Sequence, residues 1–245
     1  MPILSHKEEV NPIIWRYINL TKFISMLHKQ ALFFTYIDKL DDIYEGTYTH
    51  TFEDDLRKEF HHLNQTIFKT PATNEQIEEN IRVFKVSAAK LRRITCVNCW
   101  HERKEENALM WKAYAFPGIA IKSSYEKLHS VFNKIPQDIT IAEVNYADYE
   151  NAHLHPGNTN IPFIFKKTQY SDEKEIRILH EKNIGDYPHN APQDEIDIGQ
   201  YIKVDLQELI DEIIVSPNSP DWFFDLIKSL NEKYGLNKPI KKSSL

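Results

Sequence analysis

The sequence predicts an α+β protein with a single domain, in which a mixed central sheet carries helices on its flanks. Three observations lead to this prediction. The 245 residues are 41% hydrophobic and 12% aromatic, which is enough to bury one large core. Strand-like and helix-like hydrophobic patterns alternate irregularly along the chain, as is typical of α+β proteins. The chain has six glycines and no glycine-rich phosphate-binding motif, which argues against a Rossmann or P-loop architecture.

Hydrophobic patterns predict the elements in order. Strands are expected where apolar residues alternate or run together, at residues 11–20, 31–37, 94–100, 118–123, 138–149, 170–178, 198–206 and 212–217. Helices are expected where apolar residues recur every three or four positions, at residues 21–30, 49–63, 74–93, 105–115, 124–134 and 220–235.

Local signals mark the ends of some elements. Thr21 is the expected N-cap of the first helix and Gly235 the expected C-cap of the last. The second and third helices are expected to form a helical insertion at about 47–93. We therefore expect one domain over residues 1–238 and a flexible tail at 239–245.

Charge and composition limit the partners. The formal net charge is -6, so the protein as a whole does not attract nucleic acid. No apolar run has the length of a signal peptide or of a membrane span, and we expect a cytoplasmic protein without a membrane partner. Local basic pairs at Arg92, Arg93, Lys166 and Lys167 remain as contact points for a binding module.

The two cysteines, Cys96 and Cys99, form a CVNC motif without a second cysteine pair. On a strand, residues three apart face opposite sides, so the two thiols are expected in the core or at its rim. The expected metal content is therefore none, with zinc held through His101 as the weaker alternative.

One predicted strand carries charge along a face. In YSDEKEIRI, alternation turns Glu173, Glu175 and Arg177 to one side. The two isoleucines of this stretch face the other side and are expected in the core. A half-buried strand commonly exposes such a charged face to solvent, and the wall of an active site is the alternative.

The helix EENALMWKAYA places Met110 and Tyr114 four residues apart, with Trp111 beside them. A buried stripe is the ordinary interpretation of this pattern. The functional alternative is an aromatic wall for a planar ring such as nicotinamide or a base.

Several segments taken together resemble the bacterial family catalogued as domain of unknown function 2971, in order and over nearly the whole chain. The segments are WRY, LFFTYIDKLDDIYEG, CVNCWHERKEENALMWKAYAFPGIAIKSSYEKL, VNYADY, FKKTQYSDEKEIRI and IIVSP. The chain departs from the family at the turn, where Ile43 replaces a proline between Asp42 and Glu45.

A second resemblance concerns chemistry. The stretch from Tyr170 to Glu175 has the form aromatic-x-x-Glu-x-Glu, which is similar to the turn and strand of ADP-ribosyltransferases and implies their split sheet. The resemblance implies that NAD is the substrate, that Glu175 is catalytic and that Arg16 binds the pyrophosphate. Glu173 would position or deprotonate the accepting nucleophile, and Arg177 would orient a glutamate. Trp111 or Tyr114 would stack on the nicotinamide, and Tyr170, the aromatic residue of the motif, would also belong to the NAD-binding residues.

These implications predict an NAD-dependent mono-ADP-ribosyltransferase, acting as a bacterial toxin or phage-defence effector. Its partners would be a protein or nucleic-acid acceptor and a neutralising protein. Two alternatives stay open. One is a non-catalytic module that binds nucleic acid or protein through the basic pairs. The other is a metal-dependent nuclease, which would need Asp42, Glu45 and Glu173 to converge around a divalent ion.

Overall fold

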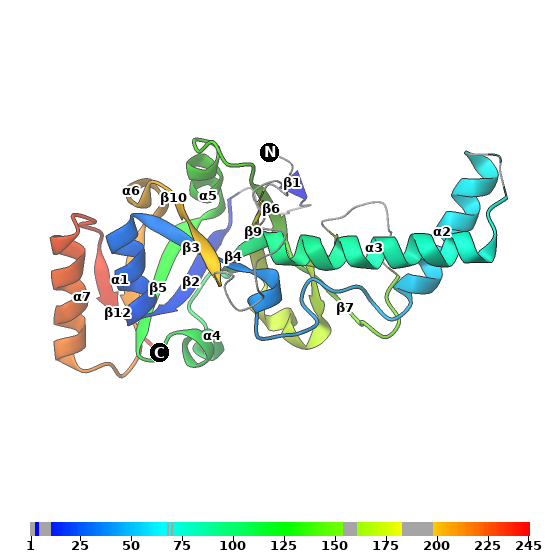
Figure 1. Ribbon diagram of the computed structural model, residues 1–245. Helices are drawn as coiled ribbons and strands as arrows, with labels where there is room; N and C mark the ends of the chain where they lie inside the picture. Colours follow the sequence, from blue (N-terminus) through cyan, green and yellow to red (C-terminus); the bar gives the residue numbers. More distant parts are fainter. Residues whose placement is uncertain (1–2, 5–10, 68, 70, 154–160, 183–197) are drawn as a thin grey trace.

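The computed structural model describes residues 3–4, 11–67, 69, 71–153, 161–182 and 198–245. In these residues one sheet of ten strands forms the centre of the molecule, with the spatial order β1-β6-β9-β4-β2-β5-β11-β12 (Figure 1). Strand β3 also pairs with β4, and β10 pairs with β3. Most neighbours are antiparallel, whereas β1 and β6, and β11 and β12, are parallel. The prediction of an α+β fold with a mixed central sheet and flanking helices is confirmed.

The bounds of the elements are as follows. The strands of the main sheet are β1 (Ile3–Leu4), β2 (Ile13–Asn19), β3 (Ala31–Tyr36), β4 (Thr95–Glu102), β5 (Gly118–Ser124), β6 (Thr140–Glu143), β9 (Glu175–Glu181), β10 (Gly199–Lys203), β11 (Glu212–Val215) and β12 (Ile240–Lys242). A second, two-stranded sheet consists of β7 (Asn145–Ala147) and β8 (Phe165–Lys167). The helices are α1 (Leu20–Lys29), α2 (Phe52–Thr66), α3 (Asn74–Ile94), α4 (Ala108–Tyr114), α5 (Tyr125–Phe132), α6 (Leu206–Leu209) and α7 (Asp221–Lys233), with 3-10 turns η1 (Ile37–Lys39), η2 (Ile161–Phe163) and η3 (Thr168–Glu173).

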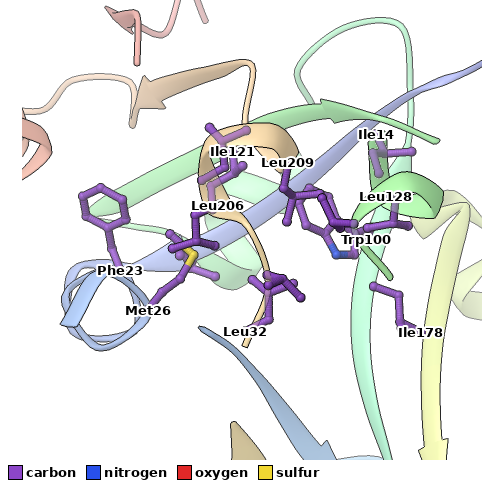
Figure 2. Packing of buried hydrophobic residues seen from close by; sticks show 14 of the residues in the cluster. Ile14, Phe23, Met26, Leu32, Trp100, Ile121, Leu128, Ile178, Leu206 and Leu209 are labelled. Carbon is purple, nitrogen blue, oxygen red and sulfur yellow. The ribbon is translucent and has the colours of Figure 1, made fainter. Parts of the chain in front are cut away.

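One face of the main sheet carries the large hydrophobic core. Alternation along β9 turns Ile176 and Ile178 to this face, as predicted, and Trp100 of β4 lies beside them. Apolar residues of helices α1, α5, α6 and α7 cover this face of the sheet. Figure 2 shows Phe23 of α1, Leu128 of α5 and Leu206 of α6 among them. Burial of this face supplies the main hydrophobic contribution to folding, at about 25 cal/mol per Å² of apolar surface removed from water.

The opposite face of the sheet is covered differently. Helix α4 packs on it through Met110 and Trp111, which contact Trp15 and Tyr17 of β2. Farther along, the segment that contains η2 and β8 covers β4 and β9. This face holds the polar residues of β9, so the side chains of Glu175 and Arg177 lie beneath a cover rather than in solvent.

Helices α2 and α3 project away from the sheet as a separate arm (Figure 1). They pack on each other around a small apolar cluster that includes Phe52, Leu56, Ile77 and Ile81. They are the two helices of the range of about 47–93, and that this range is an insertion stays a prediction. None of the helices in the described part of the chain has both the length and the apolar character that a membrane span requires.

Three local predictions are wrong. The N-cap of α1 is Asn19, whose side chain accepts the N–H of Lys22, rather than Thr21. Residues 138–149 form two strands instead of one. The backbone N–H of Val144 donates to the Glu175 carbonyl, whereas that of Asn145 donates to the Ile164 carbonyl, so the chain passes from the main sheet to the second sheet at this point. The expected flexible tail at 239–245 contains β12, which pairs with β11 and covers its free edge.

Gly46 and Gly235 offer a matched test of backbone geometry. Both have positive φ, at 71° and 68°. A Cβ on Gly46 would lie 2.4 Å from the Ile37 side chain, whereas a Cβ on Gly235 would meet nothing within 4 Å. We expect Gly235→Ala to cost about 1 kcal/mol, and Gly46→Ala to cost about 1–3 kcal/mol more because it adds overpacking to the same backbone strain. Urea denaturation measures both, and equal losses would contradict the packing around Gly46.

Candidate functional site

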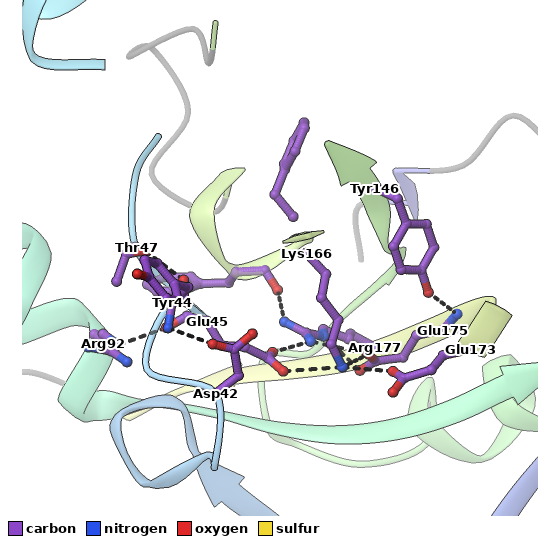
Figure 3. Close-up of polar contacts among 12 residues, drawn as sticks. Asp42, Tyr44, Glu45, Thr47, Arg92, Tyr146, Lys166, Glu173, Glu175 and Arg177 are labelled. Carbon is purple, nitrogen blue, oxygen red and sulfur yellow. Dashed lines mark hydrogen bonds and ion pairs between the residues drawn. The ribbon is translucent and has the colours of Figure 1, made fainter. Parts of the chain in front are cut away.

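Five charged side chains form a buried cluster under the cover of the sheet (Figure 3). We call this the acidic cluster; its members are Glu45, Lys166, Glu173, Glu175 and Arg177, all at most 7% exposed. Three carboxylates and two cations leave one formal negative charge in excess. Burying charge is costly unless the charges pair with one another, so these contacts decide whether the cluster can exist.

Lys166 of β8 lies at the centre of the three carboxylates. Its Nζ is 2.7 Å from Glu173 Oε2, 3.2 Å from Glu45 Oε1 and 3.4 Å from Glu175 Oε2. An ammonium group has three protons and no fixed plane, so it can serve three acceptors that approach from different elements. Lys166 therefore joins the loop after η1, the turn η3 and strand β9 at one point.

Arg177 of β9 holds two of the same carboxylates from the other side. Its Nε is 2.7 Å from Glu175 Oε1, and its Nη2 donates to Glu45 Oε2 and, at 3.2 Å, to Glu175 Oε2. Its Nη1 donates to the carbonyl of Phe163 at 2.9 Å. This planar fork fixes Glu175 with two hydrogen bonds, which leaves that carboxylate one orientation.

The loop that carries Glu45 is held by its own contacts. Asp42 accepts the backbone N–H of Tyr44, and Gly46 takes the left-handed conformation that turns the chain toward α2. Arg92 of α3 donates from Nε to the Glu45 carbonyl and from Nη2 to the Ile43 carbonyl. Hence the arm helix α3 positions the loop, and the loop positions the Glu45 carboxylate.

Glu173 lies outside strand β9, so strand alternation does not explain its position in the cluster. It ends the 3-10 turn η3, and Lys174 then takes a left-handed conformation with φ of 44° before β9 begins at Glu175. The sequence prediction placed Glu173 on the strand itself, which is wrong. The turn nevertheless brings its carboxylate to Lys166, beside that of Glu175.

The environment sets the protonation states. Burial by itself would raise the pKa of Glu175, but the charges of Arg177 and Lys166 outweigh burial and hold that pKa well below its ordinary value. Burial likewise opposes the charge of Lys166, and the carboxylates of Glu175, Glu45 and Glu173 outweigh it and raise the lysine pKa. Glu175 is thus an anion, and Lys166 a cation, at neutral pH.

Aromatic side chains connect the cluster with the surface. Tyr114 of α4 is 44% exposed, and its hydroxyl donates to Glu173 Oε1 at 2.9 Å. Tyr170 of η3 is 37% exposed, and Lys166 Nζ lies 4.7 Å from the centre of its ring. Tyr146 of β7 accepts the backbone N–H of Glu175 at 2.9 Å. We call Tyr114 and Tyr170 the aromatic rim, because both are accessible and both touch the acidic cluster.

His101 of β4 supports the same region from below. Its Nδ1 lies 3.0 Å from the carbonyl of Glu173, and its ring packs on Tyr114 at a centroid distance of 5.7 Å. Burial lowers the pKa of His101, and the nearby carboxylates only partly oppose this effect. The imidazole is therefore neutral at pH 7 and can donate from Nδ1 to the carbonyl.

The structure brings together five of the seven residues that sequence predicted for a site. Glu173, Glu175 and Arg177 lie in the acidic cluster, and Tyr114 and Tyr170 form its rim.

The other two predicted residues lie elsewhere. Trp111 is 1% exposed, packs edge-on against Tyr17 and donates to Glu106, so it offers no face for a ring to stack on. The predicted buried stripe is present only in part, because Met110 is buried but Tyr114 is 44% exposed. Arg16 lies on the opposite face of the sheet. Because Trp15, His101 and Glu175 are in register and share a face, the residue next to Trp15 must point the other way.

Sequence reasoning did not assign Glu45, Lys166 or Tyr146 to the predicted transferase site. Glu45 and Lys166 both belong to segments that carry the family resemblance, but they are 121 positions apart in the printed sequence, and no local spacing relates them. The pairing of β7 with β8 over the end of β9 places Lys166, and the contacts of Arg92 with the Glu45 loop place Glu45. The sequence offered one signal for Lys166, because this charged residue directly follows the apolar residues of the stretch FIFKK.

The arrangement bears on the two alternative functions. Within the part of the chain that the structure describes, no group of three or more His, Cys, Asp or Glu side chains is placed to hold a metal ion. Glu45 and Glu173 do converge, but on the ammonium of Lys166, while Asp42 caps the Tyr44 N–H. Cys96 and Cys99 lie on opposite sides of β4, as predicted, and burial raises the pKa of both thiols.

The basic residues expected of a binding module are not gathered on one open surface. Lys166 is buried, Arg92 is engaged with the backbone of the Glu45 loop, and the ammonium of Lys167 lies over the ring of Tyr44. Comparisons of the chain with protein-family models, curated proteins and solved structures gave no match. The function therefore has to be inferred from the site itself, and the family resemblance stays a prediction.

Replacing Lys166 tests whether its charge holds the cluster together. We expect Lys166→Met to lower the free energy of unfolding by about 3–5 kcal/mol at pH 7, because three buried carboxylates lose their shared cation. Adding Glu173→Gln should restore part of the loss by removing one of those charges. Lys167→Met, at the partly exposed neighbouring position, should change it by less than about 1 kcal/mol. Urea denaturation gives the values, and a small loss in Lys166→Met would contradict the cluster.

The pKa of Glu175 predicts how stability depends on pH. A carboxyl whose folded pKa is lowered stabilises the protein above its unfolded pKa, about 4.3, and loses this contribution as the pH falls toward the folded value. We expect the free energy of unfolding to fall below about pH 4.3, with a shallower slope in Glu175→Gln. Glu181→Gln, at an exposed position on the same strand, should keep the wild-type slope. Denaturation at a series of pH values checks this, and three equal slopes would count against it.

Proposed function

We propose that the protein is an NAD-dependent mono-ADP-ribosyltransferase-like enzyme whose reaction takes place at the acidic cluster and its aromatic rim. One observation carries the proposal: a buried cluster with an excess negative charge is in contact with two partly exposed tyrosines, Tyr114 and Tyr170. Such a site favours a planar cation, because the rings attract it through their π faces and the carboxylates through their charge. The nicotinamide ring of NAD is a planar cation.

The chemistry of NAD cleavage fits the charge of the site. When the glycosidic C–N bond breaks, its electron pair leaves with nicotinamide, which becomes neutral, and the ribosyl carbon becomes electron-deficient. A carboxylate that stays ionised beside that carbon stabilises the developing charge most when it needs no rearrangement. Glu175 meets this requirement, since Arg177 holds it in one orientation and keeps it an anion.

Glu173 is suited to a second role. It lies next to Glu175 on Lys166, and its other oxygen is hydrogen-bonded to the half-exposed Tyr114. A nucleophile that enters past the rim would meet this carboxylate first. The nucleophile would lose its proton to Glu173 while it forms a bond to the ribosyl carbon, which is general base catalysis. Lys166 binds both glutamates and would hold each of them in the position that its role requires.

The acceptor and the biological setting belong to the same proposal. The acceptor is a protein or a nucleic acid, and the protein acts as a bacterial toxin or phage-defence effector with a neutralising partner. This setting comes from the resemblance of the sequence segments to the family named above. Arg16 and Trp111 have no role in the proposed reaction, since neither lies at the acidic cluster.

An assay with labelled NAD and a cell extract tests the proposal. Wild-type protein should release nicotinamide and transfer label to macromolecules. We expect Glu175→Gln to lose at least about 100-fold in rate, since preorganised charge stabilisation is worth this much. Glu173→Gln should lose transfer to the acceptor more than it loses nicotinamide release.

Controls separate chemistry from folding. Each variant is first compared with the wild type by circular dichroism and thermal unfolding, because the acidic cluster also stabilises the fold. Tyr114→Phe keeps the ring and removes the hydroxyl, so it should retain NAD cleavage, whereas Tyr114→Ala should raise the KM for NAD. Folded wild-type protein that releases no nicotinamide from NAD would overturn the proposal and leave the cluster a structural ion-pair network.

A further inference from the structure

A pocket of about 600 Å³ lies where the main sheet divides, away from the acidic cluster. Strands β2 and β3 pair with the same edge of β4, β2 at Glu102 and His101 and β3 at Val97 and Cys96. Among the described residues, no strand pairs with the part of the β4 edge between them. Helix α1, which connects β2 to β3, and strand β10 complete the walls.

Arg16 reaches into this division of the sheet. Its Nη1 donates to the carbonyl of Cys99 at 2.7 Å, which satisfies the β4 backbone at the unpaired position. A guanidinium group carries five N–H donors and a full charge, so one carbonyl leaves most of its capacity unused. Among the residues that the structure describes, no carboxylate lies within ion-pair distance of Arg16.

The charge of Arg16 is accordingly poorly balanced. Burial lowers its pKa from the ordinary value, and the groups that oppose this effect, Cys99 and Glu175, do not cancel it. A half-buried guanidinium without an anion, at the wall of a pocket, is the arrangement in which an anionic ligand gains most, because it supplies the missing charge and two parallel hydrogen bonds.

We propose that this pocket binds a small organic anion, a phosphate or carboxylate group on an apolar body, with Arg16 as the anchor. Lys22 lies at the same pocket and adds a second positive charge. Thr21, Ser25 and Tyr201 supply hydroxyl groups, and Ser25 and Tyr201 already share a hydrogen bond of 2.5 Å. The apolar side chains of the wall, including Met26 and Leu32, suit the body of the ligand.

This pocket is separate from the site proposed for NAD. Arg16 belongs to the face of β2 that carries the large core, with Ile14 and Ile18, whereas Glu175 belongs to the opposite face. None of the residues of the acidic cluster lines the pocket. A ligand here would therefore bind without competing with NAD.

Isothermal titration with phenyl phosphate tests the inference, since this probe joins an anion to an apolar ring. Wild-type protein should bind it saturably, and phenol at the same concentrations should not bind. We expect Arg16→Gln to weaken binding by about tenfold or more, because it removes a charge-assisted bidentate contact. Ser25→Phe fills the pocket and leaves Arg16 in place, so it should weaken binding to a similar degree.

Three further results decide the outcome. Arg82→Gln, at an exposed arginine of the arm, should bind phenyl phosphate as tightly as the wild type. NAD should not displace the probe, and displacement would overturn the separation of the two sites. Absence of saturable binding to the wild type, or unchanged binding to Ser25→Phe, would overturn the pocket itself. Ser25→Phe also decides the question if Arg16→Gln fails to fold, because Arg16 is intact in that variant.

Discussion

The ion pairs of Lys166 and Arg177 with three buried glutamates are the interaction on which this side of the molecule depends. Removing such charges from water costs several kcal/mol for each ion, and the cost is offset only when every charge has close partners. The two cations meet this condition by sharing carboxylates: Lys166 binds three and Arg177 binds two. The contacts of Glu45 with Lys166 and Arg177 also join segments that are far apart in the sequence.

This sharing explains why the surrounding loops take the shapes that they do. The Glu45 loop must approach β9 closely, and Gly46 and the contacts of Arg92 allow it to do so. The end of η3 must present Glu173 to Lys166, and the left-handed Lys174 makes the turn. Left-handed backbone is unfavourable for a residue with a Cβ, and it persists here because the contacts on both sides determine it. Such positions commonly accompany functional sites.

The two faces of the sheet contribute differently to the structure: one carries the hydrophobic core and the other carries the buried charges. The face with Trp100, Ile176 and Ile178 is largely apolar and is covered by helices, so it supplies most of the hydrophobic stabilisation. The other face has less apolar area because it holds the acidic cluster, and it is covered by helix α4 together with short strands and turns. The division of the sheet between β2 and β3 is a third feature, since it leaves a carbonyl of β4 to be satisfied by Arg16 instead of by a strand.

The sequence by itself determined the fold class, most of the elements and the alternation that separates Ile176 and Ile178 from Glu175 and Arg177. These follow from periods of 2 and 3.6 residues, which are local properties of the chain. Tertiary structure decided that the charged face of β9 is buried, and that Glu45 and Lys166 complete it, because both facts depend on segments brought together from distant positions. It also decided that Arg16 lies on the other side of the sheet from Glu175, since strand order and register, which local patterns do not contain, determine which residues share a face.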